Sequence, residues 1–145
     1  MSPVNILIVD DDEDDRLMLK DALEEQSGIV SEVHFANDGE QAIDYLNHRG
    51  GFSDRENSPR PKLILLDLNM PKKDGKEVLA FIKSHADYKL IPVVIMTTSG
   101  SQQDIDDTYR LGANSFIRKP ASFTGLVNIL HDVTGYWFNI VELPK

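Results

Sequence analysis

The chain has 145 residues, of which 41% are hydrophobic and 27% are charged, and it carries a formal net charge of −9 at pH 7. This length and composition favour a single soluble domain, residues 1–145, with a sizeable core. The acidic balance argues against nucleic-acid binding, which needs a basic stripe, and the lack of cysteine excludes disulfides, thiolate zinc sites and cysteine nucleophiles.

The N-terminal segment and the apolar runs argue against a membrane. Residues 1–5 have no basic segment ahead of an extended apolar one, so they do not resemble a signal peptide. The apolar runs are too short to cross a bilayer. We therefore expect a cytoplasmic protein without a membrane partner.

The first half of the chain contains two strand–helix units. Ile6–Val9 predicts a strand, and the acidic residues after it crowd the first turn of a helix expected from about Glu13 to Gln26. The apolar positions expected to face inward on that helix are Met18, Leu19, Ala22 and Leu23. A second strand is expected from Ile29–Val30 and Val33–Ala36, interrupted by Ser31 and Glu32, and a turn at Asn37–Gly39 then begins a helix that reaches about His48.

Three more units follow a loop-like stretch, Gly50–Pro61. Unbroken apolar runs at Leu63–Leu66 and Ile91–Met96 predict strands buried on both faces, as in parallel sheets, and Ser115–Arg118 predicts a short last strand. The expected helices are Gly75–Ser84, Gln102–Leu111 with an inner face of Ile105, Thr108 and Tyr109, and a last helix with Phe123, Leu126, Val127, Leu130, Val133 and Trp137 inward.

Strand and helix thus alternate five times along the chain. Such alternation implies a parallel sheet with helices on both faces. We predict a flavodoxin-like, doubly wound (βα)5 α/β fold with strand order 2-1-3-4-5.

Polar residues follow the carboxyl ends of four of these strands and should meet at one edge of the sheet. They are Asp10 and Asp11, Asp67, Thr97, and Lys119. Carboxylates about 4 Å apart repel by roughly 1 kcal/mol in water and by about 4 kcal/mol at an effective dielectric near 20. One lysine does not balance three carboxylates, so a divalent cation is expected, and all-oxygen ligands favour Mg²⁺ or Mn²⁺.

A cation at this edge suggests phosphoryl chemistry. Mg²⁺ held by one or two carboxylates usually shares its other positions with phosphate oxygens. A carboxylate nucleophile beside a metal, a lysine and a hydroxyl can accept a phosphoryl group, which gives an aspartyl phosphate.

The set Asp10–Asp11, Asp67, Thr97 and Lys119–Pro120 resembles the receiver domain of two-component response regulators, and the intervals after Asp67 match those of the single-domain chemotaxis regulator. The resemblance covers essentially the whole chain. It implies a response regulator without an output domain, which is a phosphoacceptor signalling protein rather than an enzyme.

The resemblance also implies roles for individual residues. Asp67 would accept phosphate from a sensor histidine kinase, and Mg²⁺ would be held by Asp67, Asp11 and the Asn69 carbonyl, and by Asp10 through water. Lys119, Thr97 and Thr98 would bind the phosphoryl group. Thr97 would close onto the phosphate, and Phe116 would be the switch aromatic, here without a hydroxyl. Pro120 is the candidate for a cis peptide bond. Residues Asp12, Glu13, Asp14 and Asp15 are expected to be solvated surface.

A narrower resemblance, to single-domain regulators that serve bacterial phytochromes, is carried by the loop Gly50–Pro61, by Thr97–Ser99 and by the ending Tyr136–Pro144. It implies a phytochrome kinase as the partner. Because the ending is rich in exposed-looking apolar residues, we also expect a homodimer or partner-docking face made by this segment, Gln102–Leu111, Ser115–Arg118 and the last helix.

Two other classes of protein share parts of this pattern. An aspartate-nucleophile phosphatase of the haloacid-dehalogenase type wants an acid two residues after the nucleophile, where this chain has Asn69. A flavin or nucleotide binder on the same fold wants a glycine-rich phosphate loop after the first strand, which this sequence lacks.

Overall fold

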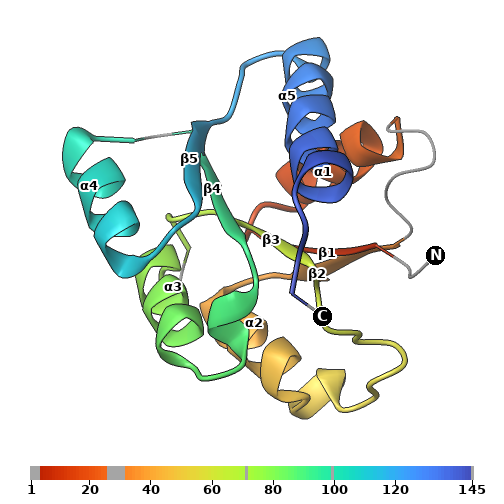
Figure 1. Cartoon of the computed structure of the whole chain (residues 1–145), viewed down its shortest axis with the longest axis vertical. Helices are drawn as coiled ribbons and strands as arrows, with labels where there is room; N and C mark the ends of the chain where they lie inside the picture. The colour runs from red at the N-terminus through yellow and green to blue at the C-terminus, as the bar shows by residue number, and fades with distance from the viewer. Residues whose placement is uncertain (1–3, 26–31, 71, 99, 145) are drawn as a thin grey trace.

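A parallel sheet of five strands runs through the protein in the order β2-β1-β3-β4-β5 (Figure 1). The computed structural model describes residues 4–25, 32–70, 72–98 and 100–144. The strands are β1 Asn5–Val9, β2 Glu32–Ala36, β3 Leu63–Leu66, β4 Val93–Thr97 and β5 Ser115–Arg118. The flavodoxin-like, doubly wound fold predicted from the alternation of strands and helices is therefore confirmed.

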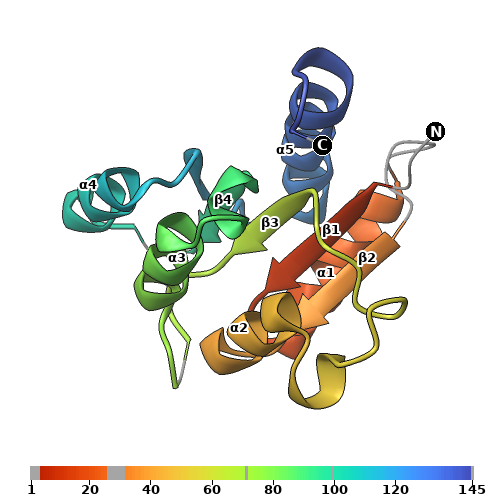
Figure 2. The same cartoon turned by 60° about the horizontal axis from the view of Figure 1, so that its bottom comes forward.

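Helices cover both faces of the sheet. They are α1 Glu13–Glu24, α2 Gly39–Asn47, α3 Gly75–Ser84, α4 Gln102–Leu111 and α5 Phe123–Gly135, with short helical turns at Gly50–Phe52, Tyr88–Leu90 and Tyr136–Ile140. Figures 1 and 2 show α1 and α5 together on one face and α2 and α3 on the other, with α4 beside α3. No helix in the described part of the chain is long and apolar enough to cross a membrane.

The unbroken apolar strands contribute side chains to two separate hydrophobic cores, one on each face of the sheet. Successive residues of a strand point to opposite faces of the sheet, so a strand covered on both faces needs apolar residues throughout. Leu7, Val9, Ile64 and Leu66 accordingly join the core beneath α2 and α3, whereas Ile6, Ile8, Leu63 and Leu65 join the core beneath α1 and α5. These two cores fix the strand ends on which the polar residues lie.

Three side chains expected to face inward are exposed instead. Met18 and Phe123 are each 42% exposed, and Tyr109 is 49% exposed. On α1 the buried stripe follows Leu19, Ala22 and Leu23, and Met18 lies off it. Phe123 is the first residue of α5, so it lies at the end of the helix rather than over the sheet.

Several boundaries also differ from the expectation. Glu32, read as an interruption, is the first residue of β2 and pairs with Asn5. The last helix ends at Gly135, and Trp137 lies in the π-helical turn that follows. Gln26 and the expected strand residues Ile29–Val30 lie outside the described residues.

Helix α4 makes polar contacts at its edges and buries little of its own surface. Thr108 is its one fully buried residue. On the α3 side, Lys76 Nζ lies 2.8 Å from Asp104 Oδ1 and 3.0 Å from Asp107 Oδ2. The hydrogen bonds from Lys76 lower the pKa of both carboxyls, and those to Asp104 and Asp107 raise the pKa of the ammonium.

This ion-pair cluster predicts an acid-sensitive link between α3 and α4. Because the pKa of Asp104 and Asp107 lies below the ordinary 3.8, the folded state binds fewer protons than the unfolded state in acid. The stabilisation is therefore present above about pH 4 and lost as pH falls through the lowered pKa values. We expect Lys76→Met to lower the melting temperature at neutral pH and to flatten its fall in acid.

The comparison is with Lys20→Met, which removes a more exposed contact to Glu24 at 3.9 Å. Thermal melts by circular dichroism across the acid range measure both variants. Parallel acid profiles for the two variants would contradict the link.

Candidate functional site

The carboxyl ends of β1 and β3 bring three carboxylates together. These strands are neighbours in register, Val9 beside Leu66, and the Asp67 N–H donates to the Val9 carbonyl at 2.9 Å. Asp10 and Asp67, each the residue after its strand, therefore lie side by side. One carboxylate oxygen from each of Asp10, Asp11 and Asp67 lies within 4.8 Å of the others.

Asp10 is the most buried member of this cluster. Its side chain is 1% exposed, and its Oδ1 accepts a hydrogen bond from the Asp12 N–H at 3.0 Å. The Arg16 guanidinium donates to its carbonyl at 2.8 Å. Burial raises the pKa of the Asp10 carboxyl, and the hydrogen bonds from Lys119 and Asp12 oppose this shift without cancelling it.

Lys119 supplies the positive charge at this edge. It follows β5, and its side chain is 8% exposed. Its Nζ lies 2.6 Å from Asp10 Oδ2, 3.2 Å from Asp15 Oδ2 and 3.5 Å from Asp67 Oδ2. Burial works to lower the pKa of Lys119, but the hydrogen bond to Asp10 and the charges of Asp67 and Asp15 outweigh it and raise that pKa.

Asp15 belongs to the site, although the sequence predicted that it would be solvated surface. Its side chain is 34% exposed, and it reaches Lys119 from the first turn of α1. The spacing contained a usable signal, because Asp15 precedes Leu19 and Leu23 at intervals of four residues and so shares their inward stripe.

Thr97 ends β4 with a buried hydroxyl. Within the described residues, its Oγ1 is one of two buried side-chain polar atoms without a hydrogen-bond partner, the other being Asn5 Oδ1. Its carbonyl accepts the Lys119 N–H at 2.9 Å, which ties the ends of β4 and β5 together. Thr98, the next residue, is exposed.

Phe116 on β5 is partly buried and packs against the core beneath α3. Its ring lies directly beneath Gly100 in the loop between β4 and α4, because a Cβ atom on that glycine would come within 2.8 Å of the ring. The Phe116 N–H donates to Tyr109 Oη at 3.2 Å, and Arg118 donates to the Gly100 carbonyl at 2.6 Å. The predicted switch aromatic thus touches the loop that follows Thr97.

Asn69 lies at the open side of the cluster. Its N–H donates to Asp67 Oδ1 at 3.4 Å. A cavity of about 430 Å³ opens here, and its lining is Asp11, Leu68, Asn69, Met70, Asp74, Lys76 and Asp104. The face of the site on which Asp11 and Asn69 lie is therefore open to this cavity.

The donor set suits a hard divalent cation. Its side-chain donors are all oxygens, and among the described residues Lys119 is the cation that forms ion pairs with carboxylates of this group, those of Asp10 and Asp67. The carboxylates of Asp10, Asp11 and Asp67 would hold Mg²⁺ or Mn²⁺.

The expected cis bond before Pro120 is not found. No peptide bond among the described residues is cis, so Lys119–Pro120 is trans. For a bond before proline the trans isomer is favoured by about 0.5–1 kcal/mol, and the sequence match to a family does not by itself override that preference.

Fold and site together define a small flavodoxin-like protein with an acidic, lysine-containing site at the carboxyl edge of its sheet. Comparison with known proteins sharpens this class. The family model of the response regulator receiver domain matches residues 6–131. Response regulator Rcp1 of Synechocystis sp. is 41% identical over 142 residues, which cover 98% of this chain and 94% of that protein.

Two solved structures of response regulators are similar to this chain in fold and sequence. The phosphorylated cyanobacterial phytochrome response regulator RcpA superposes with a TM-score of 0.90 at 40% identity, covering 99% of this chain and 100% of that one. The Mn²⁺-bound form of Rcp1 superposes with a TM-score of 0.87 at 40% identity, with the same coverage. The chain belongs to the response regulator receiver domain family, whose members are signalling proteins, and its resemblance to phytochrome response regulators is confirmed.

Gly75 lies against the backbone of the loop that carries Asp67, and a substitution there tests how tightly the two segments pack. A Cβ atom on Gly75 would overlap the Asp67 carbonyl oxygen and lie 2.6 Å from Leu68 Cα. We expect Gly75→Ala to lower the free energy of unfolding by about 1–3 kcal/mol, as overpacking does. Urea unfolding measures this change.

Gly51→Ala is the matched control, because nothing lies within 4 Å of a Cβ atom there. That variant should be as stable as the unchanged protein or slightly more so. Equal unfolding midpoints for the two variants would argue against a tight approach at Gly75.

Proposed function

We propose that Asp67 accepts a phosphoryl group from the phosphohistidine of a sensor histidine kinase in a reaction that depends on Mg²⁺ or Mn²⁺. One observation carries the proposal: the Asp67 carboxylate lies between two further carboxylates and the Lys119 ammonium, at the end of a strand next to the one that ends in the unpartnered Thr97 hydroxyl. The family membership supports it, as does a relative described as phosphorylated.

In this reaction an Asp67 oxygen forms a bond to phosphorus while the bond from phosphorus to the histidine nitrogen breaks, and the electron pair leaves on that nitrogen. Lys119 neutralises charge on the phosphoryl oxygens. The Thr97 hydroxyl gains an acceptor when it donates to one of those oxygens. The bound cation would supply charge neutralisation at the phosphoryl oxygens.

The kinase is proposed to be a phytochrome. The support is the similarity to Rcp1 and RcpA, of which RcpA is described as a phytochrome response regulator. The partner would approach over the cavity lined by Asp11, Leu68 and Asn69, the residues beside Asp10 and Asp67 in the chain.

The signal is proposed to leave through α4, β5 and α5. Thr97 joins the acceptor edge to the loop before α4, and Gly100 of that loop rests on the Phe116 ring. A shift of the Thr97 hydroxyl toward a phosphoryl group would move this loop and the lightly buried α4. Because Phe116 has no hydroxyl, its part in the switch is the burial of its ring.

Acetyl phosphate tests the acceptor directly. We expect the unchanged protein to gain one phosphoryl group in the presence of Mg²⁺, because acetate is a good leaving group and the site neutralises the transferred charge. Asp67→Asn should gain none, and removal of the metal by chelation should abolish uptake. Intact-mass spectrometry measures each case.

The control variant is Asp87→Asn, which changes the same charge on the cavity lined by Leu143 and Pro144, away from the acceptor edge. It should gain the phosphoryl group as the unchanged protein does. Uptake by Asp67→Asn, or steady hydrolysis of other phosphate esters without a stable adduct, would contradict the phosphoacceptor role.

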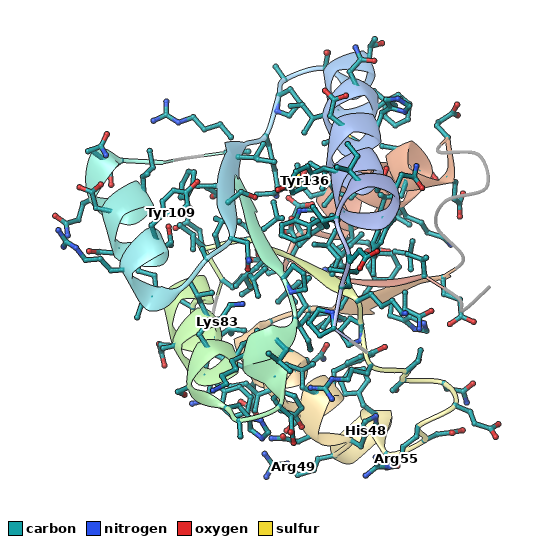
Figure 3. All side chains as sticks on the ribbon, viewed as in Figure 1. His48, Arg49, Arg55, Lys83, Tyr109 and Tyr136 are labelled. Atoms are coloured by element: carbon teal, nitrogen blue, oxygen red, sulfur yellow. The ribbon has the colours of Figure 1, made fainter. Side chains whose placement is uncertain are left out.

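A homodimer through α4, β5, α5 and the C-terminal segment is the proposed assembly. Tyr109 and Tyr136, both labelled in Figure 3, are each 49% exposed, and Ile140 is 72% exposed. These exposed apolar side chains lie on α4 and in the turn after α5, and a dimer through these elements would cover them. We expect light scattering to report a dimer, and the double variant Tyr136→Ser with Ile140→Ser to report a monomer.

Leu17→Ser is the control, since Leu17 is 48% exposed on α1, which is not part of the proposed surface. It should leave the dimer intact. A monomer for the unchanged protein, with and without phosphorylation, would refute the proposed assembly.

A further inference from the structure

Lys119 is shared by three carboxylates, and one of them, Asp15, lies outside the group of possible metal ligands. An ammonium has three hydrogens, so these contacts engage every donor that Lys119 has. The contact with Asp10 is 2.6 Å, that with Asp15 is 3.2 Å, and that with Asp67 is 3.5 Å. The acceptor residue therefore has the weakest hold on the lysine.

We propose that Asp15 is a positioning residue that holds Lys119 back from the phosphoryl-binding position and so restrains phosphorylation of Asp67. This inference rests on the proposed function of Asp67. The backbone of Asp15 is fixed at the start of α1, where its N–H donates to Asp12 Oδ1 at 3.2 Å. Its carboxylate is thus held beside the lysine rather than sampling solvent freely.

The number of donors on the ammonium favours this role. For Lys119 Nζ to move onto a phosphoryl group carried by Asp67, one of the two shorter contacts has to lengthen. The Asp10 side chain is 1% exposed and the Asp15 side chain is 34% exposed. Water can solvate a released Asp15, whereas a released Asp10 would remain a buried charge without its partner. Asp15 is therefore the contact that yields.

The charge of Asp15 also acts against phosphorylation of Asp67. An Asp15 carboxylate 3.2 Å from the ammonium offsets part of the positive potential that an incoming phosphoryl group would meet. Removing that charge while keeping the side-chain volume should strengthen the pull of Lys119 on the transferred group. Asp15→Asn does this with the smallest change in shape.

Asp14 is the matched control. It lies in the same helical turn with the same charge, and its N–H also donates to Asp12 Oδ1, at 2.9 Å. In the part of the chain that the structure describes, no ion pair joins Asp14 to Lys119. Asp14→Asn therefore reports the general effect of removing one negative charge near the site.

The experiment compares initial rates of phosphorylation by acetyl phosphate at saturating Mg²⁺. In this step the oxygen of Asp67 bonds to phosphorus, and the bond from phosphorus to the acetate oxygen breaks with its electron pair. We expect Asp15→Asn to react about two- to fivefold faster than Asp14→Asn, the range that corresponds to one partly exposed ion pair. Asp15→Glu, which keeps the charge, should restore the rate of the unchanged protein.

Two further readouts separate positioning from a general effect on the fold. In a Lys119→Met background, Asp15→Asn should lose its advantage over Asp14→Asn, because the effect passes through the lysine. The Mg²⁺ dissociation constant, measured by calorimetry, should be the same for Asp15→Asn and Asp14→Asn.

An Asp15→Asn rate equal to or below that of Asp14→Asn would overturn the inference while leaving the proposed function intact. An acceleration that persists without Lys119 would overturn it as well. If the unchanged protein takes up no phosphoryl group at all, the proposed function fails first and this inference fails with it.

Discussion

The close approach of like charges at the carboxyl edge is the constraint on which the rest of the site depends. Because β1 and β3 are parallel and in register, Asp10 and Asp67 lie side by side at their ends. The Asp11 carboxylate lies close to both. Such pairs repel by roughly 4 kcal/mol at an effective dielectric near 20 and a spacing of about 4 Å. Lys119 offsets one charge, and its raised pKa keeps it protonated. The remaining imbalance explains why the site suits a divalent cation.

The two cores hold the strands of this edge in place, and α4 is less buried than the strands. Strands β1, β3 and β4 are almost wholly buried, so the strand ends cannot move apart to relieve the repulsion. Helix α4, by contrast, buries only Thr108 and depends on Lys76 at one edge and Tyr109 at another. A change of charge at the rigid edge would thus be relieved by movement of the loop and helix beyond Thr97.

The topology and the residues that gather at the edge could be predicted from the sequence, because strand periodicity and the ends of parallel strands determine both. The role of Asp15 could be predicted only in part. Its spacing to Leu19 and Leu23 indicates that it shares the inward stripe of α1, but not that Lys119 lies within reach of its carboxylate. Met18 and Phe123 were misplaced because spacing identifies a helix more reliably than it fixes which flanking position faces inward. The trans bond at Pro120 is a local isomer choice that no pattern of neighbours encodes.

The side chains that the structure describes at the site also limit which phosphoryl donors it could use, because none of them is placed to protonate a leaving group. Asn69 stands where a phosphatase of the haloacid-dehalogenase type has an acid, and its amide cannot give a proton to a departing alkoxide. Lys119 is kept protonated by its carboxylates, and Asp10 is engaged with it at 2.6 Å. A donor therefore has to carry a leaving group that departs without protonation by the protein. Phosphohistidine and acetyl phosphate carry such a group, and an ordinary phosphate ester does not. The carboxylates and lysine that would draw a phosphoryl group onto Asp67 would thus restrict the proposed transfer to activated donors, which is the selectivity that control by phosphorylation would require.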